Sequence, residues 1–337
     1  MKDARPARIE ASPQYHRGRF RNPVQTRMMV GRELMRELAH QIGGRVERKP
    51  RRPLPIVQLR RADFDPPPAT GLRATWLGHS TALVEIDGAT LLVDPVWTDR
   101  ASPFRHLGPK RFHPPPLPLA ELPRIDAVVI SHDHYDHLDR HTVPRLAALA
   151  PIVTSLGVGE RLERWDIAPD RITELDWHEA VTMGGVRITA TPACHFSGRG
   201  VLDRNKSLWS SWVLAGPRHK VFFSGDTSLY DGLAEIGRAY GPFDLDLMKI
   251  GAYSSAWPDV HMTPEEALRA HAMIGGPAML AIHWGTFNLA FHAWNEPPER
   301  LVRAVRESSL EVLIPRPGER VEPERPPVLS PWWRDVG

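Results

Sequence analysis

One short segment holds the side chains best suited to chemistry. His132, His134 and His137 lie close together with Asp136, directly after the apolar run 125–130. That run is typical of a buried strand, so the cluster should lie at the end of a strand. Imidazole nitrogens and carboxylate oxygens bind zinc and similar transition ions. Because the segment offers two separate ligand sets, it predicts a site for two metal ions.

Three more metal-competent side chains stand at strand ends. His195, Asp226 and His283 each follow an apolar run closely. Open α/β architectures gather their functional groups at the C-terminal ends of strands. One such residue alone would more often be a hydrogen-bonded structural group, but three of them together with the histidine-rich segment favour a shared site.

The elements that must position these residues alternate between strands and helices. Asp87-Gly88 is expected to form a hairpin turn, and Thr263 should cap a helix that has Pro264 in its first turn. This mixture of hairpins and βαβ units predicts sheets covered by helices. Strands are expected over 74–77, 82–86, 90–93, 125–130, 151–154, 172–175, 186–191, 208–214, 220–224, 245–250, 279–282 and 312–314, and helices over 138–149, 158–165, 229–240, 264–274 and 298–308.

Composition limits the class of protein. With 337 residues and 42% hydrophobic content, the chain can bury a large core. Cys194 is the single cysteine, so an internal disulfide and a thiolate zinc site are both excluded. No run reaches the roughly 18 apolar residues needed to span a bilayer, and the first residues lack the apolar core of a signal peptide. These features predict a soluble, cytoplasmic protein.

Charge divides the chain into a basic arm and an acidic body. Residues 1–61 hold 16 Lys and Arg against 5 Asp and Glu, or +11, whereas the remainder holds 27 against 35, or −8. We therefore expect an N-terminal arm over 1–62 and a hydrolase domain over 63–337. Little regular structure is expected over 1–23.

An amphipathic helix is predicted inside the arm, over 24–42, ended by Gly43-Gly44. Its apolar residues, Leu34 and Met35 among them, interleave with arginines. Two interpretations stay open. The arm can bind an anionic membrane surface or another polyanion, or the helix can pack on the main domain.

The ligand pattern resembles that of the metallo-β-lactamase superfamily. Further blocks resemble its branch of N-acyl-phosphatidylethanolamine-hydrolysing phospholipases D. These blocks are Trp76-Leu77-Gly78-His79-Ser80-Thr81, Leu92-Val93-Asp94-Pro95, Gly108-Pro109-Lys110-Arg111-Phe112, Gly241-Pro242-Phe243-Asp244 and Ala281-Ile282-His283-Trp284-Gly285-Thr286-Phe287. The resemblance implies an α/β (α+β) fold, an αββα sandwich of two mixed sheets with helices on both sides.

The resemblance also implies roles for single residues. One zinc ion would be held by His132, His134 and His195, and the other by Asp136, His137 and His283, with Asp226 bridging them; iron or manganese could replace zinc. Asp136 and His261 are expected to be catalytic, and Tyr135 and His261 to contact the substrate phosphate. Asp94 and His79 are expected to hydrogen-bond the ligands. The sequence departs from the family at Lys249, where proline is expected, and at Cys194 and Val260, where amides are expected.

The function implied is that of a zinc-dependent phosphodiesterase of the phospholipase D type, acting on N-acyl-phosphatidylethanolamine-like phospholipids through a metal-bridging hydroxide. His261 would orient the phosphoryl oxygen or protonate the leaving alkoxide; its alternative is a helix-cap role beside Thr263. A lactonase or carboxylic ester hydrolase on the same dinuclear site and a nucleic-acid phosphodiesterase are the alternatives. A metal-free binding protein is disfavoured because none of the seven ligands is missing.

The expected partners are a phospholipid or another phosphodiester substrate, a membrane surface contacted peripherally through 1–62, and a second copy of the chain in a homodimer. No stable nucleic-acid partner is expected. Trp332-Trp333 would suit an exposed interface with lipid or another subunit. An acyl-binding groove would draw on the remaining aromatic candidates, Trp97, Trp209, Trp212, Trp257, Trp284 and Trp294.

Overall fold

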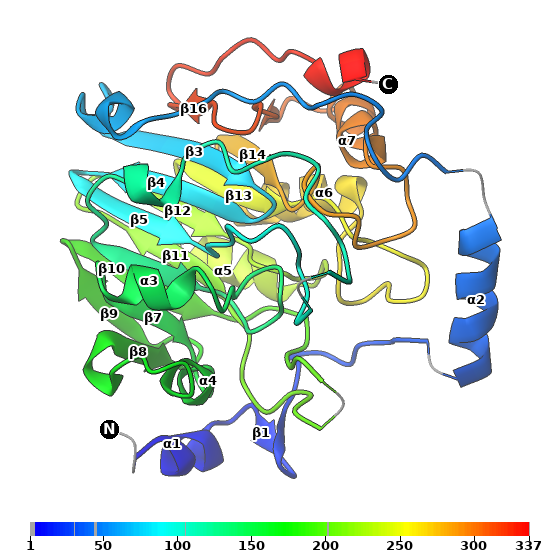
Figure 1. The fold of residues 1–337 in the computed structure, drawn as a ribbon. Helices are drawn as coiled ribbons and strands as arrows, with labels where there is room; N and C mark the ends of the chain where they lie inside the picture. The colour runs from blue at the N-terminus through cyan, green and yellow to red at the C-terminus, as the bar shows by residue number, and fades with distance from the viewer. Residues whose placement is uncertain (1–3, 30, 44–45, 105, 201, 337) are drawn as a thin grey trace.

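Two seven-stranded sheets packed face to face form the centre of the molecule (Figure 1). The computed structural model describes residues 4–29, 31–43, 46–104, 106–200 and 202–336. The first sheet has the order β16-β3-β4-β5-β6-β7-β8 and the second the order β15-β14-β13-β12-β11-β10-β9. Their bounds are β3 (Leu72–Gly78), β4 (Thr81–Ile86), β5 (Ala89–Val93), β6 (Ala127–Ile130), β7 (Ile152–Ser155), β8 (Ile172–Leu175), β9 (Ala180–Met183), β10 (Val186–Thr191), β11 (Ser211–Ala215), β12 (Lys220–Phe223), β13 (Leu245–Lys249), β14 (Ala278–Ile282), β15 (Glu311–Leu313) and β16 (Arg320–Val321).

Both sheets are mixed, as expected. In the first, β16, β3, β4 and β5 pair antiparallel and β5 to β8 pair parallel. In the second, β9 to β12 pair antiparallel and β12 to β15 pair parallel. The antiparallel part of the first sheet starts from a tight hairpin, because Asp87 (φ 50°) and Gly88 (φ 89°) both adopt the left-handed conformation that a type I′ turn requires.

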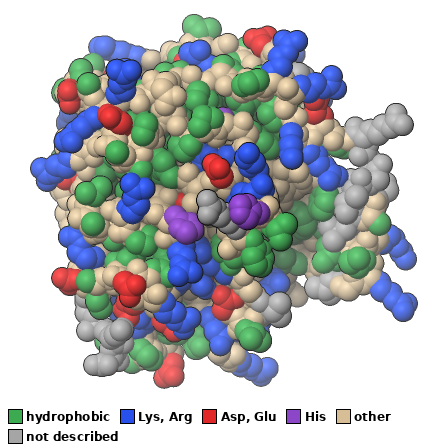
Figure 2. All heavy atoms as spheres, viewed as in Figure 1, with side chains coloured by type: hydrophobic (Ala, Val, Ile, Leu, Met, Phe, Trp, Pro, Cys, Tyr) green, Lys and Arg blue, Asp and Glu red, His purple; other side chains and the backbone are tan. Residues whose placement is uncertain are grey.

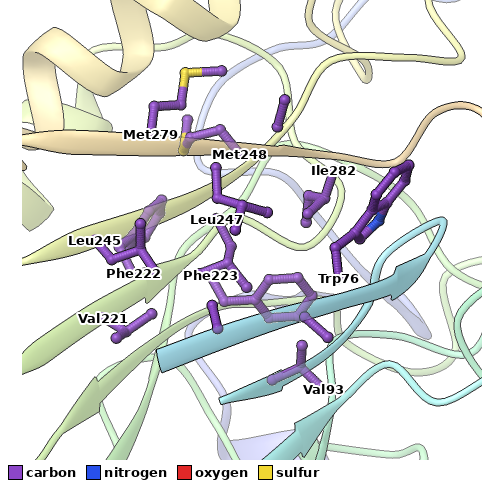
Figure 3. Close-up of a cluster of buried hydrophobic side chains, with 14 of the residues drawn as sticks. Trp76, Val93, Val221, Phe222, Phe223, Leu245, Leu247, Met248, Met279 and Ile282 are labelled. Atoms are coloured by element: carbon purple, nitrogen blue, oxygen red, sulfur yellow. The ribbon is translucent and has the colours of Figure 1, made fainter. Parts of the chain in front are cut away.

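The core lies between the sheets, and alternation along each strand decides which side chains enter it. Leu91 and Val93 join the cluster shared with the second sheet, whereas Leu92 faces the outer cluster. Figure 3 shows Phe223 of the second sheet near Val93 of the first, with Leu247 on the far side of Phe223, and all three belong to one core cluster. The registers of β5, β12 and β13 are therefore fixed by burial on both faces.

Helices cover the outer faces of both sheets, which confirms the αββα arrangement. The first sheet carries α3 (Val143–Ala147) and α4 (Gly159–Glu163), and the second carries α5 (Gly232–Tyr240), α6 (Pro264–Ile274) and α7 (Glu296–Val305) (Figure 1). Thr263 caps α6 as predicted: its hydroxyl accepts from Glu266 N, and the Glu266 carboxylate accepts from Thr263 N.

The helix expected over 138–149 is mostly wrong, because only α3 forms there. Pro144 has no N–H for the carbonyl four residues before it, so a helix cannot run through this position. Asp139 also holds the residues before Pro144 in a non-helical conformation. Its carboxylate accepts hydrogen bonds from the backbone of Trp97 (3.2 Å), Thr98 (3.1 Å) and His141 (2.9 Å).

The exposed interface expected at Trp332-Trp333 is also wrong. Both side chains are buried, within the 3₁₀ turn η5 (Trp332–Val336). Their rings contact that of Trp284, with centroids 5.3 and 5.8 Å apart, and Trp333 Nε1 donates to Glu299 (2.7 Å). The C-terminal segment thus covers the core next to the end of β14.

The first part of the N-terminal arm packs on the main body. It contains α1 (Arg5–Ala11) and a small hairpin of β1 (Tyr15–His16) and β2 (Arg19–Phe20), so the expectation of little regular structure over 1–23 is wrong. Arg5 is paired with Glu163 and Glu174, and Phe20 is completely buried. Charge attraction between the basic arm and the acidic body therefore acts within the chain.

The predicted helix in the second part of the arm, unlike the first part, lies away from the two sheets (Figure 1). The helix predicted over 24–42 begins later, at Gly31, and ends at Gly43 as α2; Gly44 and the side chains of Leu38 and Ile42 lie outside the described residues. Figure 1 shows α2 at the edge of the molecule, separated from the two sheets. Met35 on α2 is 65% exposed.

Candidate metal centre

The seven predicted metal ligands meet at one end of the two sheets. They extend from the C-terminal ends of four strands that belong to both sheets. His132, His134, Asp136 and His137 follow β6, His195 follows β10, Asp226 follows β12 and His283 follows β14. Since parallel strands point their carboxyl ends to the same edge, ligands far apart in the sequence come together here.

The first ligand set is formed by His132, His134 and His195. His132 Nε2 lies 2.8 Å from His134 Nδ1, which lies 3.2 Å from His195 Nε2. Tetrahedral zinc with bonds of about 2.0–2.2 Å separates its ligand atoms by roughly 3.3–3.6 Å. The three nitrogens are therefore spaced as a small metal ion requires, or slightly closer.

The second set is formed by Asp136, His137 and His283. Asp136 Oδ2 lies 3.4 Å from His137 Nε2 and 3.6 Å from His283 Nε2. Asp226 contacts both sets: one oxygen lies 3.6 Å from His195 Nε2 and 3.3 Å from His137 Nε2, and the other 3.0 Å from His283 Nε2. The carboxylate of Asp226 thus lies between the two sets, where a bridging ligand would be.

Unpartnered atoms show that these residues fit bound cations. Among the described residues, His137 Nε2, His283 Nε2 and Asp226 Oδ1 are buried without a hydrogen-bond partner. A buried polar atom left in this state costs about 1–3 kcal/mol. Coordination of a metal by all three atoms would offset that cost. The donor set of nitrogen and oxygen suits zinc, iron or manganese.

Electrostatics prepares His132, His195, Asp136 and Asp226 in the forms that metals bind. Burial lowers the pKa of His132 and of His195 well below the usual value, so these rings are neutral. Burial opposes ionisation of Asp226 and Asp136, yet the neighbouring histidines hold the pKa of each carboxyl well below its usual range. Burial also lowers the pKa of His137, but the surrounding carboxylates outweigh it and raise that pKa well above its usual value. The site therefore favours positive charge.

Outer partners fix the orientation of the ligand rings, as predicted for Asp94 and His79. Asp94 Oδ2 accepts from His137 Nδ1 (2.6 Å) and from the hydroxyl of Ser131 (2.6 Å). His79 Nε2 lies 2.9 Å from Asp136 Oδ2. Asp94, His79 and His283 have φ angles of 39°, 51° and 62°. Backbone strain of this kind clusters at functional sites, where the surrounding contacts maintain it.

His261 faces the ligand cluster. Its Nε2 lies 4.0 Å from Asp226 Oδ2, and its ring centroid 5.0 Å from that of His195. Thr263 caps α6 with Glu266 alone, so the helix-cap interpretation of His261 is not needed. Burial and the nearby charge of Lys249 lower the pKa of His261 well below its usual value.

Tyr135 lies on the opposite side of the metal-binding loop. Its ring stacks on the guanidinium of Arg199, 4.4 Å from the ring centroid, and its hydroxyl donates to the Arg199 carbonyl (3.4 Å). The side chain lines a neighbouring cleft, whereas His134 and Asp136 line the pocket over the ligands. A substrate contact for Tyr135 stays a prediction.

Sequence reasoning missed the contribution of the arm to this site. Asn22 Oδ1 accepts from the backbone N–H of His195 (2.9 Å), and Met28 lines the pocket over the metal ligands. The pocket has a volume of about 230 Å³, and Phe196, Trp257 and Leu289 complete its apolar wall. The stretch Phe20-Arg21-Asn22-Pro23, which faintly resembles the same phospholipase branch, was a signal for this contribution.

The tryptophans predicted to line an acyl-binding groove fall into two groups, one that lines the pocket and one that packs in the protein interior. Trp257 is the one tryptophan among the predicted groove candidates that lines this pocket, within the part of the chain that the structure describes. Trp209, Trp212, Trp284 and Trp294 are core side chains with at most 3% exposure, and Trp97 packs partly buried against the outer cluster of the first sheet.

Lys249 is a buried cation beside the site. It ends β13 on the inter-sheet face, and its Nζ donates to the carbonyl of Gly251 (2.9 Å). Burial lowers the pKa of Lys249 to about 8. A cation here adds to the positive potential around the metal ligands.

Comparisons with known proteins agree with this geometry. The family model described as "Beta-lactamase superfamily domain" matches residues 89–284, more than half of the chain. The chain belongs to the metallo-β-lactamase superfamily. Igni18, a metallo hydrolase from Ignicoccus hospitalis, shares the fold, with a TM-score of 0.57 and 23% identity over 74% of this chain and 97% of its own.

Within the superfamily, the chain is similar to two kinds of relative. An uncharacterised protein of Mycobacterium tuberculosis is 47% identical over 96% of this chain and 88% of its own length. The N-acyl-phosphatidylethanolamine-hydrolyzing phospholipase D 1 of Caenorhabditis elegans is 39% identical over 74% of this chain and 73% of its own, and the mitochondrial enzyme of that name from Saccharomyces cerevisiae 33% identical over 67% and 50%. Fold, ligand set and relatives together identify a metal-dependent hydrolase.

Proposed function

We propose that this protein is a zinc-dependent phosphodiesterase of the phospholipase D type that acts on N-acyl-phosphatidylethanolamine-like phospholipids. The observation that supports this substrate class is the apolar wall of Met28, Trp257 and Leu289 directly over the metal ligands. A phospholipid combines an anionic phosphate with acyl chains, so it needs both a cationic centre and an apolar wall. The relatives in Caenorhabditis elegans and Saccharomyces cerevisiae carry names of the same activity.

The residues divide the work of the reaction. Bound at the two ligand sets, metal ions would acidify a water molecule and neutralise the phosphate charge. His261, neutral because burial lowers its pKa, donates its ring N–H to a phosphoryl oxygen and so orients the phosphate. Asp94 and His79 hold the ligand side chains in place. Met28, Trp257 and Leu289 exclude water from the acyl side of the substrate.

Substrate profiling tests the proposal. Zinc-reconstituted protein is assayed in parallel on N-acyl-phosphatidylethanolamine, a lactone and single-stranded RNA. Hydrolysis is expected for the phospholipid, with release of the N-acylethanolamine and phosphatidic acid. Leu289→Ala is expected to lower kcat/KM for the long-chain substrate roughly tenfold and to spare a short-chain analogue, because buried apolar area is lost only for the long chain.

Leu149→Ala is the matched control, since Leu149 is exposed and outside the pocket. It should leave kcat/KM unchanged for both the long-chain and the short-chain substrate. Turnover of the lactone or RNA but not of the phospholipid would reject the proposed substrate class and favour one of the alternative hydrolases. An equal loss on both chain lengths in Leu289→Ala would reject the acyl wall.

The arm supports a second part of the proposal, that α2 rests on an anionic membrane surface. Met35 is exposed on α2, with the exposed Arg32 and Arg36 close to it. Apolar area and positive charge are the two components of interfacial binding. Because Met28 just before α2 lines the pocket, a bilayer under α2 would lie near the site. Among the described residues, no helix is long and apolar enough to cross a bilayer.

Vesicle sedimentation tests the docking of α2. Met35→Asp is expected to reduce pelleting with phosphatidylglycerol vesicles several-fold, because it removes apolar contact and adds repulsion, and high salt should weaken the binding of both proteins. Leu149→Asp is the control at an equally exposed leucine. Equal pelleting of wild type and Met35→Asp would contradict a role of α2 at the membrane.

A further inference from the structure

A second cleft lies beside the metal-binding loop and has a different character from the metal-site pocket. Its volume is about 950 Å³, and its wall includes five cationic side chains: Arg100, Lys110, Arg140, Arg161 and Arg199. Lys, Arg and His side chains gather near the centre of the face drawn in Figure 2. Tyr135 belongs to this wall, while its sequence neighbours His134 and Asp136 line the metal-site pocket. The two cavities therefore lie on opposite sides of one loop.

Two of the cations are held directly opposite each other. Arg100 and Lys110 form an isolated antiparallel bridge, and the hydrogen bonds from Arg111 N to Asp99 O (2.8 Å) and from Ala101 N to Pro109 O (3.2 Å) close the loop around them. Opposite residues of such a pair have Cβ atoms about 4.5–5.5 Å apart, and like charges there repel. A bound anion would turn this repulsion into attraction.

These charges lack carboxylate partners within the described chain. Lys110 and Arg140 make no ion pair or side-chain hydrogen bond there, and Arg100 donates only to the carbonyl of Gly108 (2.6 Å). Arg161 differs, because Asp133 and Asp203 neutralise it. Three surface cations on one concave wall thus remain available to a ligand.

Arg199 adds a cation at the base of the cleft. Its guanidinium is held between the rings of Tyr135 and Trp165, at 4.4 and 4.9 Å, and donates to the carbonyls of Asp133 (2.6 Å) and Leu138. Its partners are neutral carbonyls and aromatic faces, so the charge is not cancelled. Burial lowers the pKa of Arg199 to about 10, because it outweighs the opposing effect of the Asp133 and Asp139 carboxylates.

The two carboxylates of the wall do not cancel the positive charge. Asp139 is turned towards the backbone, where Trp97, Thr98 and His141 donate to it. Asp99 is exposed and forms no ion pair with the cations of the cleft among the described residues. Because Asp133 and Asp203 neutralise Arg161, the four other cations of the wall stand against two carboxylates, which leaves a net formal charge of +2.

We propose that this cleft is a second anion site, which binds a phosphate-bearing ligand against Arg100, Lys110 and Arg140. Guanidinium groups match the oxygens of phosphate in bidentate pairs, and an ammonium group adds a point charge. The ligand is additional to the phosphate that is cleaved, because the metal-binding loop separates the cleft from the ligand cluster. Either a soluble phosphate compound or the headgroup of a phospholipid supplies this chemistry. The proposal is independent of the reaction at the metal centre.

Titration calorimetry of the metal-loaded full chain tests the site. The probes are inorganic pyrophosphate, and vesicles of phosphatidylcholine with or without phosphatidate. The variant is Lys110→Gln with Arg140→Gln, and the matched control is Arg238→Gln with Arg306→Gln, two exposed arginines outside the cleft. One binding event per chain is expected to weaken at least about tenfold in the cleft variant alone, because two charge-assisted contacts are lost.

Measurements on the metal centre show whether the cleft substitutions have damaged the rest of the protein. Metal content, thermal midpoint and turnover of a short-chain substrate should be the same in the cleft variant and the wild type. Pyrophosphate binding that depends on the cleft residues assigns a soluble ligand, and binding only to phosphatidate vesicles assigns a headgroup. Identical titrations of variant and wild type with both probes would overturn the proposal, because all binding would then take place elsewhere, as at the metal centre.

Discussion

Asp226→Ala is expected to bind about one metal equivalent where the wild type binds about two, and to lose more than about 100-fold in kcat. The reason is the position of this carboxylate between the ligand sets, with oxygens 3.6 Å from His195 Nε2 and 3.0 Å from His283 Nε2. Outer partners of metal ligands already cost about 10–100-fold in affinity or activity when removed, so a direct ligand should cost more. Elemental analysis and steady-state kinetics measure the two effects.

Asp226→Asn and Asp231→Ala complete this experiment. Asn keeps the shape of the side chain but not its charge, so it should also lose metal even if the alanine variant folds poorly. Asp231 is an exposed carboxylate just before α5, so Asp231→Ala should change neither metal content nor turnover. Because bound metal stabilises the folded state, a chelator should lower the thermal midpoint of the wild type more than that of Asp226→Asn. Wild-type metal content and turnover in Asp226→Asn would make Asp226 a structural turn residue.

His261→Ala is expected to lower kcat about 10²–10⁴-fold while both metal equivalents remain bound. His261 lies 4.0 Å from Asp226 and can be grouped with His195 and Asp226, but it stands outside the two proposed ligand sets, which are complete without it. Burial and Lys249 lower its pKa well below the usual value, so a neutral ring would be available to donate a hydrogen bond to the phosphoryl oxygen of the proposed substrate.

His261→Gln separates orientation from proton transfer. An amide N–H can replace the donor but cannot deliver a proton near neutral pH. Orientation therefore predicts that the glutamine variant recovers a large part of the kcat lost in the alanine variant, whereas proton delivery predicts equal losses. A fall in metal content in either variant would instead make His261 a metal ligand, as its grouping with His195 and Asp226 would then require.

Local chemistry explains what the sequence determined by itself. The ligand loop after β6 and the cap of α6 at Thr263 each depend on residues that are close together in the sequence. The hairpin turn at Asp87-Gly88 needs two positive φ angles, and that dipeptide supplies them readily. His195, Asp226 and His283 could be placed at strand ends because apolar runs precede them, and the resemblance to a family then paired them into two sets.

Only the tertiary structure decided which distant surfaces meet. The contact of Asn22 with His195, the place of Met28 in the pocket wall and the burial of Trp333 join segments separated by many residues, and no local pattern encodes such a pairing. The same holds for the cleft, since the opposition of Arg100 and Lys110 depends on how one loop closes. Local conformational preferences act within a few residues, whereas the free energy of burying a surface depends on the partner that the whole fold brings to it.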